Sequence, residues 1–142
     1  NEKAASVEPF KLELKPDSTW EEAASNRAPP RWQMLAKQKE VHRFIKLALK
    51  LRLIRKSQSK AWSQVLLTKK PNGAWRFCLD FRSLNLNTKS IGWPIPNIRD
   101  VLDRIAKTGA KYFAVTQGYY QMMIDEASRY LTALRTAFGI FE

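Results

Sequence analysis

The sequence contains almost none of the residues that build covalent crosslinks or soft metal sites. Of its 142 residues, one is a cysteine and one is a histidine. The single thiol, Cys78, excludes an intrachain disulfide and a cysteine-based zinc site. Metal chemistry would therefore have to rest on carboxylates. No run of about 18 apolar residues occurs, because cations interrupt the longest candidate at residues 44–54, so a membrane-spanning helix is excluded.

Acidic residues are also scarce. The chain has 13 Asp and Glu against 25 Lys and Arg, which gives a net charge of +12 and an isoelectric point near 10.1. This balance implies a polyanionic partner, and RNA or another nucleic acid is the usual one. Aromatic residues between the cations favour nucleic acid over an acidic membrane or a merely solvated surface. We expect an intracellular protein whose compartment the sequence does not specify; an organelle ribonucleoprotein is one setting that fits.

Prolines separate the first part of the chain from the rest. Residues 1–30 contain four prolines and little periodicity, so we predict an extended arm that lies along something else, either this molecule or a partner. A helix is predicted to begin after Pro29-Pro30, since proline suits a first turn. Its apolar residues, from Trp32 to Leu49, recur at helical spacing, and lysines and arginines load the opposite face.

Two strand-like runs, residues 65–70 and 75–80, flank a turn at residues 71–74. Pro71 fixes φ, and Gly73 supplies the positive φ that closes such a turn. The alternation places Trp75, Phe77 and Leu79 on one face of the second run, where we expect them to be core. The pattern predicts a β-hairpin.

A second helix is predicted after Asn97, whose side chain can cap it, and Gly109 is expected to end it. Residues 111–115 are predicted to form a buried strand. Residues 125–135 fit either a helix or a short turn followed by a strand. Together these elements predict an α+β fold with a β-hairpin and two main helices.

The block VLLTKKPNGAWRFCLDFRSLN at residues 65–85 is much more specific. It resembles the fingers hairpin of reverse transcriptases from long-terminal-repeat (gypsy-like) retrotransposons. Segments at 93–98, 111–121 and 132–139 resemble the same family's palm. The resemblance implies an N-terminal arm (1–30), a fingers-like region (31–92, with the basic helix and hairpin 65–80) and an incomplete palm-like region (93–142).

The resemblance also implies functional residues. Lys69 and Arg76 match triphosphate contacts, Arg82 matches a template contact, and Tyr119 matches the aromatic residue beside the incoming sugar. Solvent-facing charges and a packed palm tyrosine are the alternatives, and Asp80 is interpreted as an anchor for the hairpin. The nucleic-acid or phosphate-binding candidates are six cations: Lys56, Lys60, Lys69, Lys70, Arg76 and Arg82.

The catalytic carboxylates of the family have no counterpart. Two-metal phosphoryl transfer needs carboxylates that hold two cations. The family has an aspartate between the strand and the Gly-Tyr turn, but here Val115 runs directly into Thr116-Gln117-Gly118. The later Tyr-x-Asp-Asp motif is not in the sequence. We therefore predict no catalytic residue, no metal site and no cofactor, with Mg²⁺ relevant only if those aspartates exist elsewhere in a longer chain.

Three functional hypotheses remain. The favoured one is a noncatalytic, domesticated reverse-transcriptase remnant, a pseudoenzyme that serves as a basic RNA-binding or structural component of a larger ribonucleoprotein with other protein subunits. The first alternative is a truncated or incomplete piece of an active RNA-directed DNA polymerase. The second is a protein-interaction subunit without a nucleic-acid role.

Overall fold

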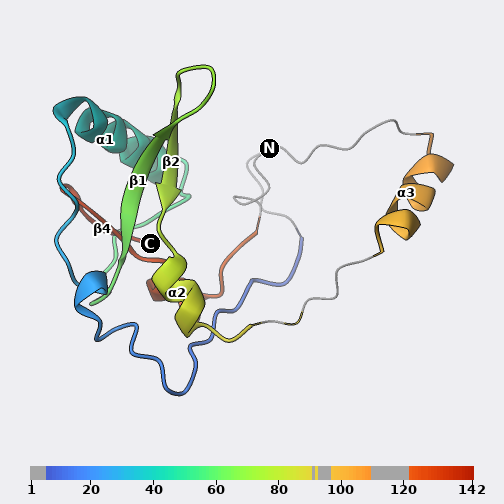
Figure 1. Ribbon diagram of the computed structural model, residues 1–142, viewed down its shortest axis with the longest axis horizontal. Coiled ribbons are helices and arrows are strands. Elements are labelled where there is room, and N and C mark those ends of the chain that lie inside the picture. Colours follow the sequence, from blue (N-terminus) through green and yellow to red (C-terminus); the bar gives the residue numbers. More distant parts are fainter. Residues whose placement is uncertain (1–5, 91, 93–96, 110–121) are drawn as a thin grey trace.

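The computed structural model describes residues 6–90, 92, 97–109 and 122–142 of the chain (Figure 1). The predicted α+β class is confirmed, with a β-hairpin, two main helices and a four-stranded sheet. In chain order the elements are η1 (Ala24–Asn26), α1 (Leu35–Lys50), β1 (Ser63–Lys69), β2 (Trp75–Leu79), α2 (Arg82–Asn87), α3 (Ile98–Lys107), η3 (Glu126–Thr132), β3 (Leu134–Thr136) and β4 (Gly139–Phe141).

The sheet has the strand order β2-β1-β3-β4. Strands β1 and β2 form the predicted hairpin, in a register that pairs Val65 with Leu79 and Lys69 with Trp75. Gly73 adopts φ 79° in the turn, as expected of a residue that must enter the left-handed region. Strand β3 runs parallel to β1 and antiparallel to β4, so the end of the chain completes the sheet.

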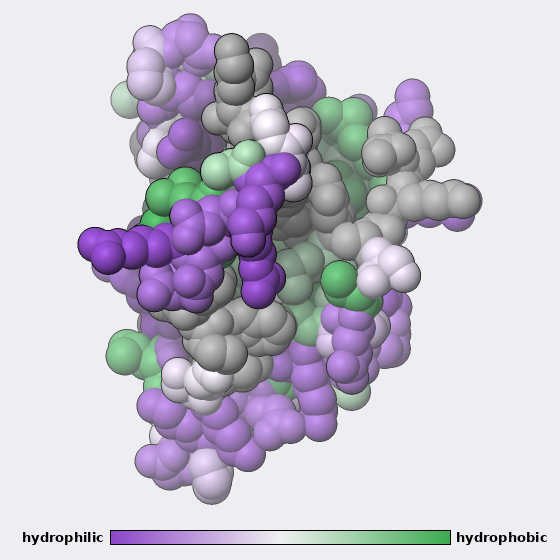
Figure 2. Space-filling model, turned by 90° about the vertical axis from the view of Figure 1, so that its right-hand side faces the viewer, coloured by the Kyte–Doolittle hydropathy of each residue, from purple (hydrophilic) through white to green (hydrophobic). Residues whose placement is uncertain are grey.

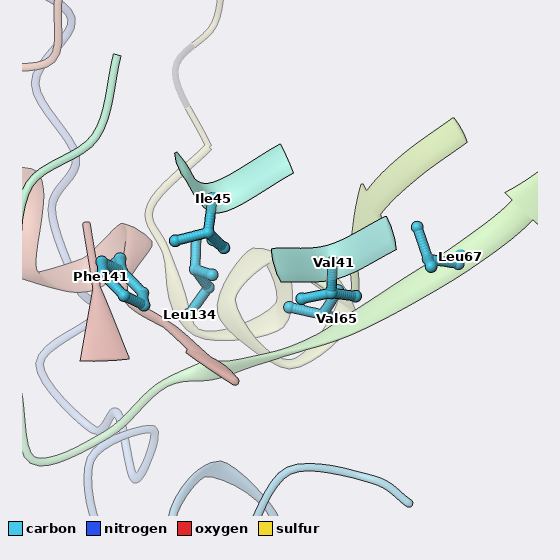
Figure 3. Close-up of a cluster of buried hydrophobic side chains, with 6 residues drawn as sticks. All are labelled: Val41, Ile45, Val65, Leu67, Leu134 and Phe141. Atoms are coloured by element: carbon cyan, nitrogen blue, oxygen red, sulfur yellow. The ribbon is translucent and has the colours of Figure 1, made fainter. Parts of the chain in front are cut away.

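Helix α1 covers one face of this sheet and builds the main hydrophobic core (Figure 3). The Phe44 ring stacks on Phe77 with centroids 3.9 Å apart. Trp75 and Leu79 pack against the same cluster, which confirms that alternate residues of β2 share a core-facing side. The buried members of the cluster are Val41, Ile45, Val65, Leu67, Leu134 and Phe141.

The predicted start of this helix was wrong. Helix α1 begins at Leu35, five residues after the proline pair, and the Trp32 side chain is 83% exposed. Hydrogen bonds to the first strand explain the late start. The backbone N–H of Arg31 donates to Gln64 Oε1, and Gln33 Nε2 donates to the carbonyl of Val65. Tertiary pairing thus holds residues 31–34 out of the helix.

The N-terminal arm lies along other parts of the chain, as predicted. Phe10 forms a parallel bridge with Ile124, and Leu14 forms an antiparallel bridge with Thr88. The arm also carries the 3₁₀ turn η1 and contributes Trp20, which is fully buried. The second core cluster consists of Trp20, Ala61, Leu84 and Leu131. The division into three segments stays a prediction.

Helix α3 has the predicted ends but no buried residue. Asn97 Oδ1 accepts a hydrogen bond from Arg99 N at 3.0 Å, and Gly109 follows the helix with φ 70°. The helix stands apart from the other elements in Figure 1. Its side of the molecule is largely hydrophilic, with hydrophobic residues interspersed (Figure 2).

The ambiguous segment after Asp125 forms a turn followed by a strand. Residues Glu126–Thr132 form a 3₁₀ helix, and β3 follows directly. The strand predicted at 111–115 and the family-like segments at 93–96 and 118–121 lie outside the described residues.

Candidate nucleic-acid interface

The tip of the hairpin carries two adjacent lysines beside a hydrogen-bonded turn. The N–H of Lys70 donates to the carbonyl of Ala74, and its own carbonyl accepts from Gly73 N. These bonds fix the backbone, while the Lys70 side chain is exposed. Lys69 Nζ lies 5.5 Å from the centroid of the Trp75 ring, where a cation–π contact stabilises its position. The turn therefore presents two charges from a hydrogen-bonded backbone.

Helix α1 adds a second cation at the same indole. Lys37 Nζ lies 5.7 Å from the Trp75 centroid. The helical pattern of the sequence placed Lys37 on α1, but nothing in the pattern indicated that this residue reaches the hairpin. Such a contact depends on how the helix packs on the sheet.

Arg76 belongs to the other face of the hairpin. It pairs with Thr68, whereas Lys69 pairs with Trp75, and directly paired residues project to the same side of a ribbon. Successive residues alternate between faces, so Arg76 and Lys69 project in opposite directions. The resemblance implies that both residues contact one triphosphate. The structure allows this only at the edge or tip of the hairpin.

Arg82 is held at the base of the hairpin by Asp80. Its Nε and Nη2 donate to Asp80 Oδ1 and Oδ2 at 2.8 and 2.7 Å, a two-pronged ion pair. The hydrogen bonds from Arg82 lower the pKa of Asp80 to about 2, and Arg31 adds a weaker attraction from 3.9 Å. Asp80 N also donates to the carbonyl of Gln64. These contacts agree with the interpretation of Asp80 as an anchor.

The remaining candidates lie elsewhere. Lys56 and Lys60 are exposed in the connection between α1 and β1. The backbone of Lys56 forms an isolated antiparallel β-bridge with Phe141. Strand β1 separates them from the hairpin tip by about 23 Å, since a strand rises about 3.3 Å per residue. The six cations therefore do not form one site. Lys69, Lys70 and Arg76 lie toward the tip of the hairpin, and Arg82 lies at its base. Lys56 and Lys60 lie in the connection between α1 and β1. Tyr119 lies outside the described residues.

A hollow of 370 Å³ lies between α1 and the hairpin. Glu40 and Arg43 of α1 and Lys70 of the hairpin are among its lining residues. Arg43 Nε lies 3.1 Å from Glu40 Oε1, and this hydrogen bond lowers the pKa of Glu40, which keeps the carboxylate ionised. The hollow therefore joins the basic side of α1 to the hairpin tip.

A second hollow of 230 Å³ is bordered by exposed aromatic rings. Trp32 and Phe138, 83% and 44% exposed, both line it, and Phe138 packs against His42 with ring centroids 4.3 Å apart. Stacking on exposed rings is a common mode of single-strand binding. The sequence pattern assigned Trp32 to the apolar face of the helix and so missed its exposure.

The acids nearest the family's catalytic strand do not fit a metal site. Asp125 Oδ1 accepts from Ala127 N and caps η3. Glu126 pairs with Arg55 and with Arg129, at 2.5 and 2.7 Å. Within the described ranges, no group of three His, Cys, Asp or Glu side chains is placed to hold a metal ion. Within the same ranges, no helix has the length and hydropathy needed to cross a bilayer.

Known proteins resemble this chain in sequence. It is 31% identical over 111 residues to the retrovirus-related Pol polyprotein of transposon 412 from Drosophila melanogaster, which covers 72% of the chain and 9% of that polyprotein. It is 34% identical over 70 residues to an RNA-directed DNA polymerase homolog of Oenothera berteroana, covering 47% of the chain and 48% of that protein. No family model matches the chain.

The fold has solved counterparts. A foamy viral protease-reverse transcriptase in complex with an RNA/DNA hybrid superposes with a TM-score of 0.68 at 16% identity, over 97% of this chain and 18% of that one. The predicted relationship to retroelement reverse transcriptases is confirmed, and the gypsy-like subtype is compatible with these relatives. The chain is therefore homologous to the Pol polyproteins of retrotransposons and shares the fold of one part of the foamy viral protease-reverse transcriptase.

Proposed function

We propose that this chain is a noncatalytic, reverse-transcriptase-derived element that binds RNA or an RNA/DNA hybrid through its hairpin, as a component of a larger ribonucleoprotein. The observation that carries the proposal is the exposed pair Lys69 and Lys70 on a turn that the main core supports from behind. Lysine offers point charges to phosphate without reading sequence. The RNA/DNA hybrid bound to the foamy viral relative supports a nucleic-acid ligand.

The noncatalytic part of the proposal rests on the carboxylates. No acid lies between Val115 and Gly118, and the two acids that follow, Asp125 and Glu126, are engaged in a cap and in ion pairs. Metal-assisted phosphoryl transfer needs carboxylates that are free to ligate and close together. The residues of this chain therefore favour binding without chemistry.

An active polymerase of which this chain is one part is the second candidate. The chain spans about a tenth of the transposon polyprotein that it matches, so a longer protein could supply the missing groups. This candidate predicts metal-dependent primer extension once the rest of the polypeptide is present. The favoured proposal predicts no extension with either Mg²⁺ or Mn²⁺, whether or not the rest of the polypeptide is present.

Binding is best tested by fluorescence anisotropy of a labelled RNA/DNA hybrid at several salt concentrations. The affinity should fall steeply with salt, because phosphate contacts release counterions. The triple variant Lys69→Ala, Lys70→Ala, Arg76→Ala should reduce the slope of log K against log salt by about two to three, or roughly one per lost contact. The matched control replaces the exposed α3 cations Arg99, Arg104 and Lys107. A salt-independent affinity, or equal losses in both variants, would refute binding by the hairpin.

A further inference from the structure

We infer that the outer face of α1 is a second nucleic-acid-binding surface, which follows the phosphate backbone away from the hairpin. The inference concerns a surface that the proposed hairpin site does not use. Four cations occur on α1 at intervals of four, three and four residues, and all four are exposed. These residues, together called the α1 stripe, are Lys39, Arg43, Lys46 and Lys50.

The α1 stripe faces away from the sheet. At 100° per residue, its members fall on the side of the helix opposite the buried residues Val41, Ile45 and Ala48. The stripe is about 16 Å long, at 1.5 Å of rise per residue. A duplex carries one charge per about 1.7 Å of its axis, so a linear polyanion presents many phosphates over this length.

The N-terminal end of α1 lacks the features that stabilise a helix end. A helix N-terminus carries partial positive charge, which favours acids and a capping side chain in the first turn. Helix α1 has neither: Met34 at its N-cap makes no side-chain hydrogen bond, no acid lies in the first turn, and Lys37 and Lys39 lie close to this end. The cations near the N-terminus therefore need an explanation other than helix stability.

Helix α3 provides the contrast within the same molecule. Asn97 caps it, Asp100 lies in its first turn, and Arg104 and Lys107 lie in its last turn. This is the order that the helix dipole favours. The charges of α3 are thus accounted for by the stability of that helix. In α1 the same holds for Lys50, which lies in the last turn, but not for Lys37 and Lys39 near the N-terminus.

The end of α1 has a second local cost. Arg52 has φ 56°, and it is the one non-glycine residue with positive φ among the residues that the structure describes. Arg52 N donates to the Leu49 carbonyl and Leu53 N to the Ala48 carbonyl, a helix ending that normally favours glycine at the position of Arg52. An arginine here is strained. We attribute its presence to the additional charge that it provides beyond Lys50.

The stripe also connects to the hairpin. Arg43 and Lys70 line the same hollow of 370 Å³, so a nucleic acid bound at the tip can continue onto α1. Glu40 lies in this hollow too, where it offsets one of the charges by pairing with Arg43. A bilayer fits less well, because an interfacial helix inserts its apolar face, and the face of α1 that carries Val41 and Ile45 is buried against the sheet. Leu47 and Leu49 are 46% and 36% exposed.

The test compares labelled RNA/DNA hybrids of about 8 and about 24 base pairs, using the whole 142-residue chain. The triple variant Lys39→Gln, Lys46→Gln, Lys50→Gln should weaken binding of the long duplex by about 10- to 100-fold at moderate salt and lower its salt slope by about two to three. Binding of the short duplex should change less than about threefold. The control Arg99→Gln, Arg104→Gln, Lys107→Gln removes the same charge from α3, and it should change both affinities less than about threefold.

The variant Arg52→Gly separates binding from folding. Glycine relieves the left-handed strain, so the midpoint of thermal unfolding should rise by about 2–5 °C while binding of the long duplex weakens. A variant that is merely misfolded would lose both.

Three results would overturn the inference: equal losses from the α1 and α3 triple variants, equal losses for the short and long duplexes, or α1 lysines that are needed for phosphatidylserine vesicles but not for the duplex. Failure of the hairpin proposal is distinguishable, because hairpin variants should weaken the short and long duplexes alike.

Discussion

Helices α1 and α3 are both amphipathic, yet they have different relations to the rest of the molecule. Helix α1 buries Val41, Ile45 and Ala48, and its apolar face is the centre of the main core. Helix α3 buries none of its residues, and Ile98 and Leu102 are 71% and 57% exposed. An amphipathic pattern therefore shows which face of a helix can be buried but not whether a surface is there to bury it.

The helix with less packing, α3, has the more favourable N-terminal end. Helix α3 has a capping side chain and an acid in its first turn, which favour an isolated helix. Helix α1 lacks both, although each helix has a basic residue in its last turn. Short helices without tertiary packing are marginal in water, so favourable ends matter most where packing is absent. Helix α1 can carry cations near its uncapped N-terminus because its packing on the sheet supplies the stability.

The largest effect is expected from Ile45→Ala in α1. The Ile45 side chain is 2% exposed and lies between the sheet and the helix (Figure 3). Its truncation should lower the free energy of unfolding by about 2–5 kcal/mol, from lost burial and from the cavity left behind. Urea unfolding followed by circular dichroism measures this change. A loss below about 1 kcal/mol would show that α1 does not pack on the sheet as described.

An intermediate effect is expected from Asp80→Asn at the base of the hairpin. The folded pKa of Asp80, about 2, lies below its usual value, so the ion pair with Arg82 stabilises the fold above about pH 4. This contribution is lost as the pH falls toward 2. The variant should cost about 1 kcal/mol at pH 7, since the Arg82 side chain is 82% exposed and water therefore screens the ion pair from that side.

The pH dependence is the sharper part of this prediction. Unfolding of the wild-type chain and of Asp80→Asn should be compared between pH 7 and pH 2, and the difference between the two should shrink as the pH falls. Asp103→Asn on exposed α3 is the matched control, with an expected change below about 0.5 kcal/mol at pH 7. A difference that persists unchanged at pH 2 would assign the effect to the amide substitution rather than to the ion pair.

The smallest effect is expected from Leu102→Ala in α3. Leucine and alanine have similar helix propensities, and the Leu102 side chain is 57% exposed. The free energy of global unfolding should therefore change by less than about 0.5 kcal/mol. A loss near that of Ile45→Ala would mean that α3 is packed against a surface, and it would remove the contrast between the two helices.

Local patterns predicted the elements that depend on neighbours in the chain. The hairpin followed from Pro71, Gly73 and the alternation of β2, and the bounds of α3 followed from Asn97 and Gly109. The start of α1 failed because hydrogen bonds from Arg31 and Gln33 to a strand about thirty residues away hold residues 31–34 in an extended path. Sequence spacing carries no signal for such a contact.

The candidate site divides in the same way. The block at residues 65–85 identified Lys69, Lys70, Arg76 and Arg82 as a group, because these residues are close in the chain. Only the structure separated Lys69 from Arg76 onto opposite faces of the ribbon and paired Arg82 with Asp80. It also brought Lys37 to the Trp75 ring. Distances between elements depend on packing, which no local pattern encodes.

The sequence by itself determined the family, the basic character, the hairpin and the absence of an acid between Val115 and Gly118. Each of these depends on residue identity or on local backbone preference. The tertiary structure decided that α1 packs on the sheet, that α3 buries none of its residues, and that the α1 stripe faces away from the sheet. These outcomes depend on which apolar faces meet in three dimensions, because burial is a property of pairs of surfaces rather than of a single segment.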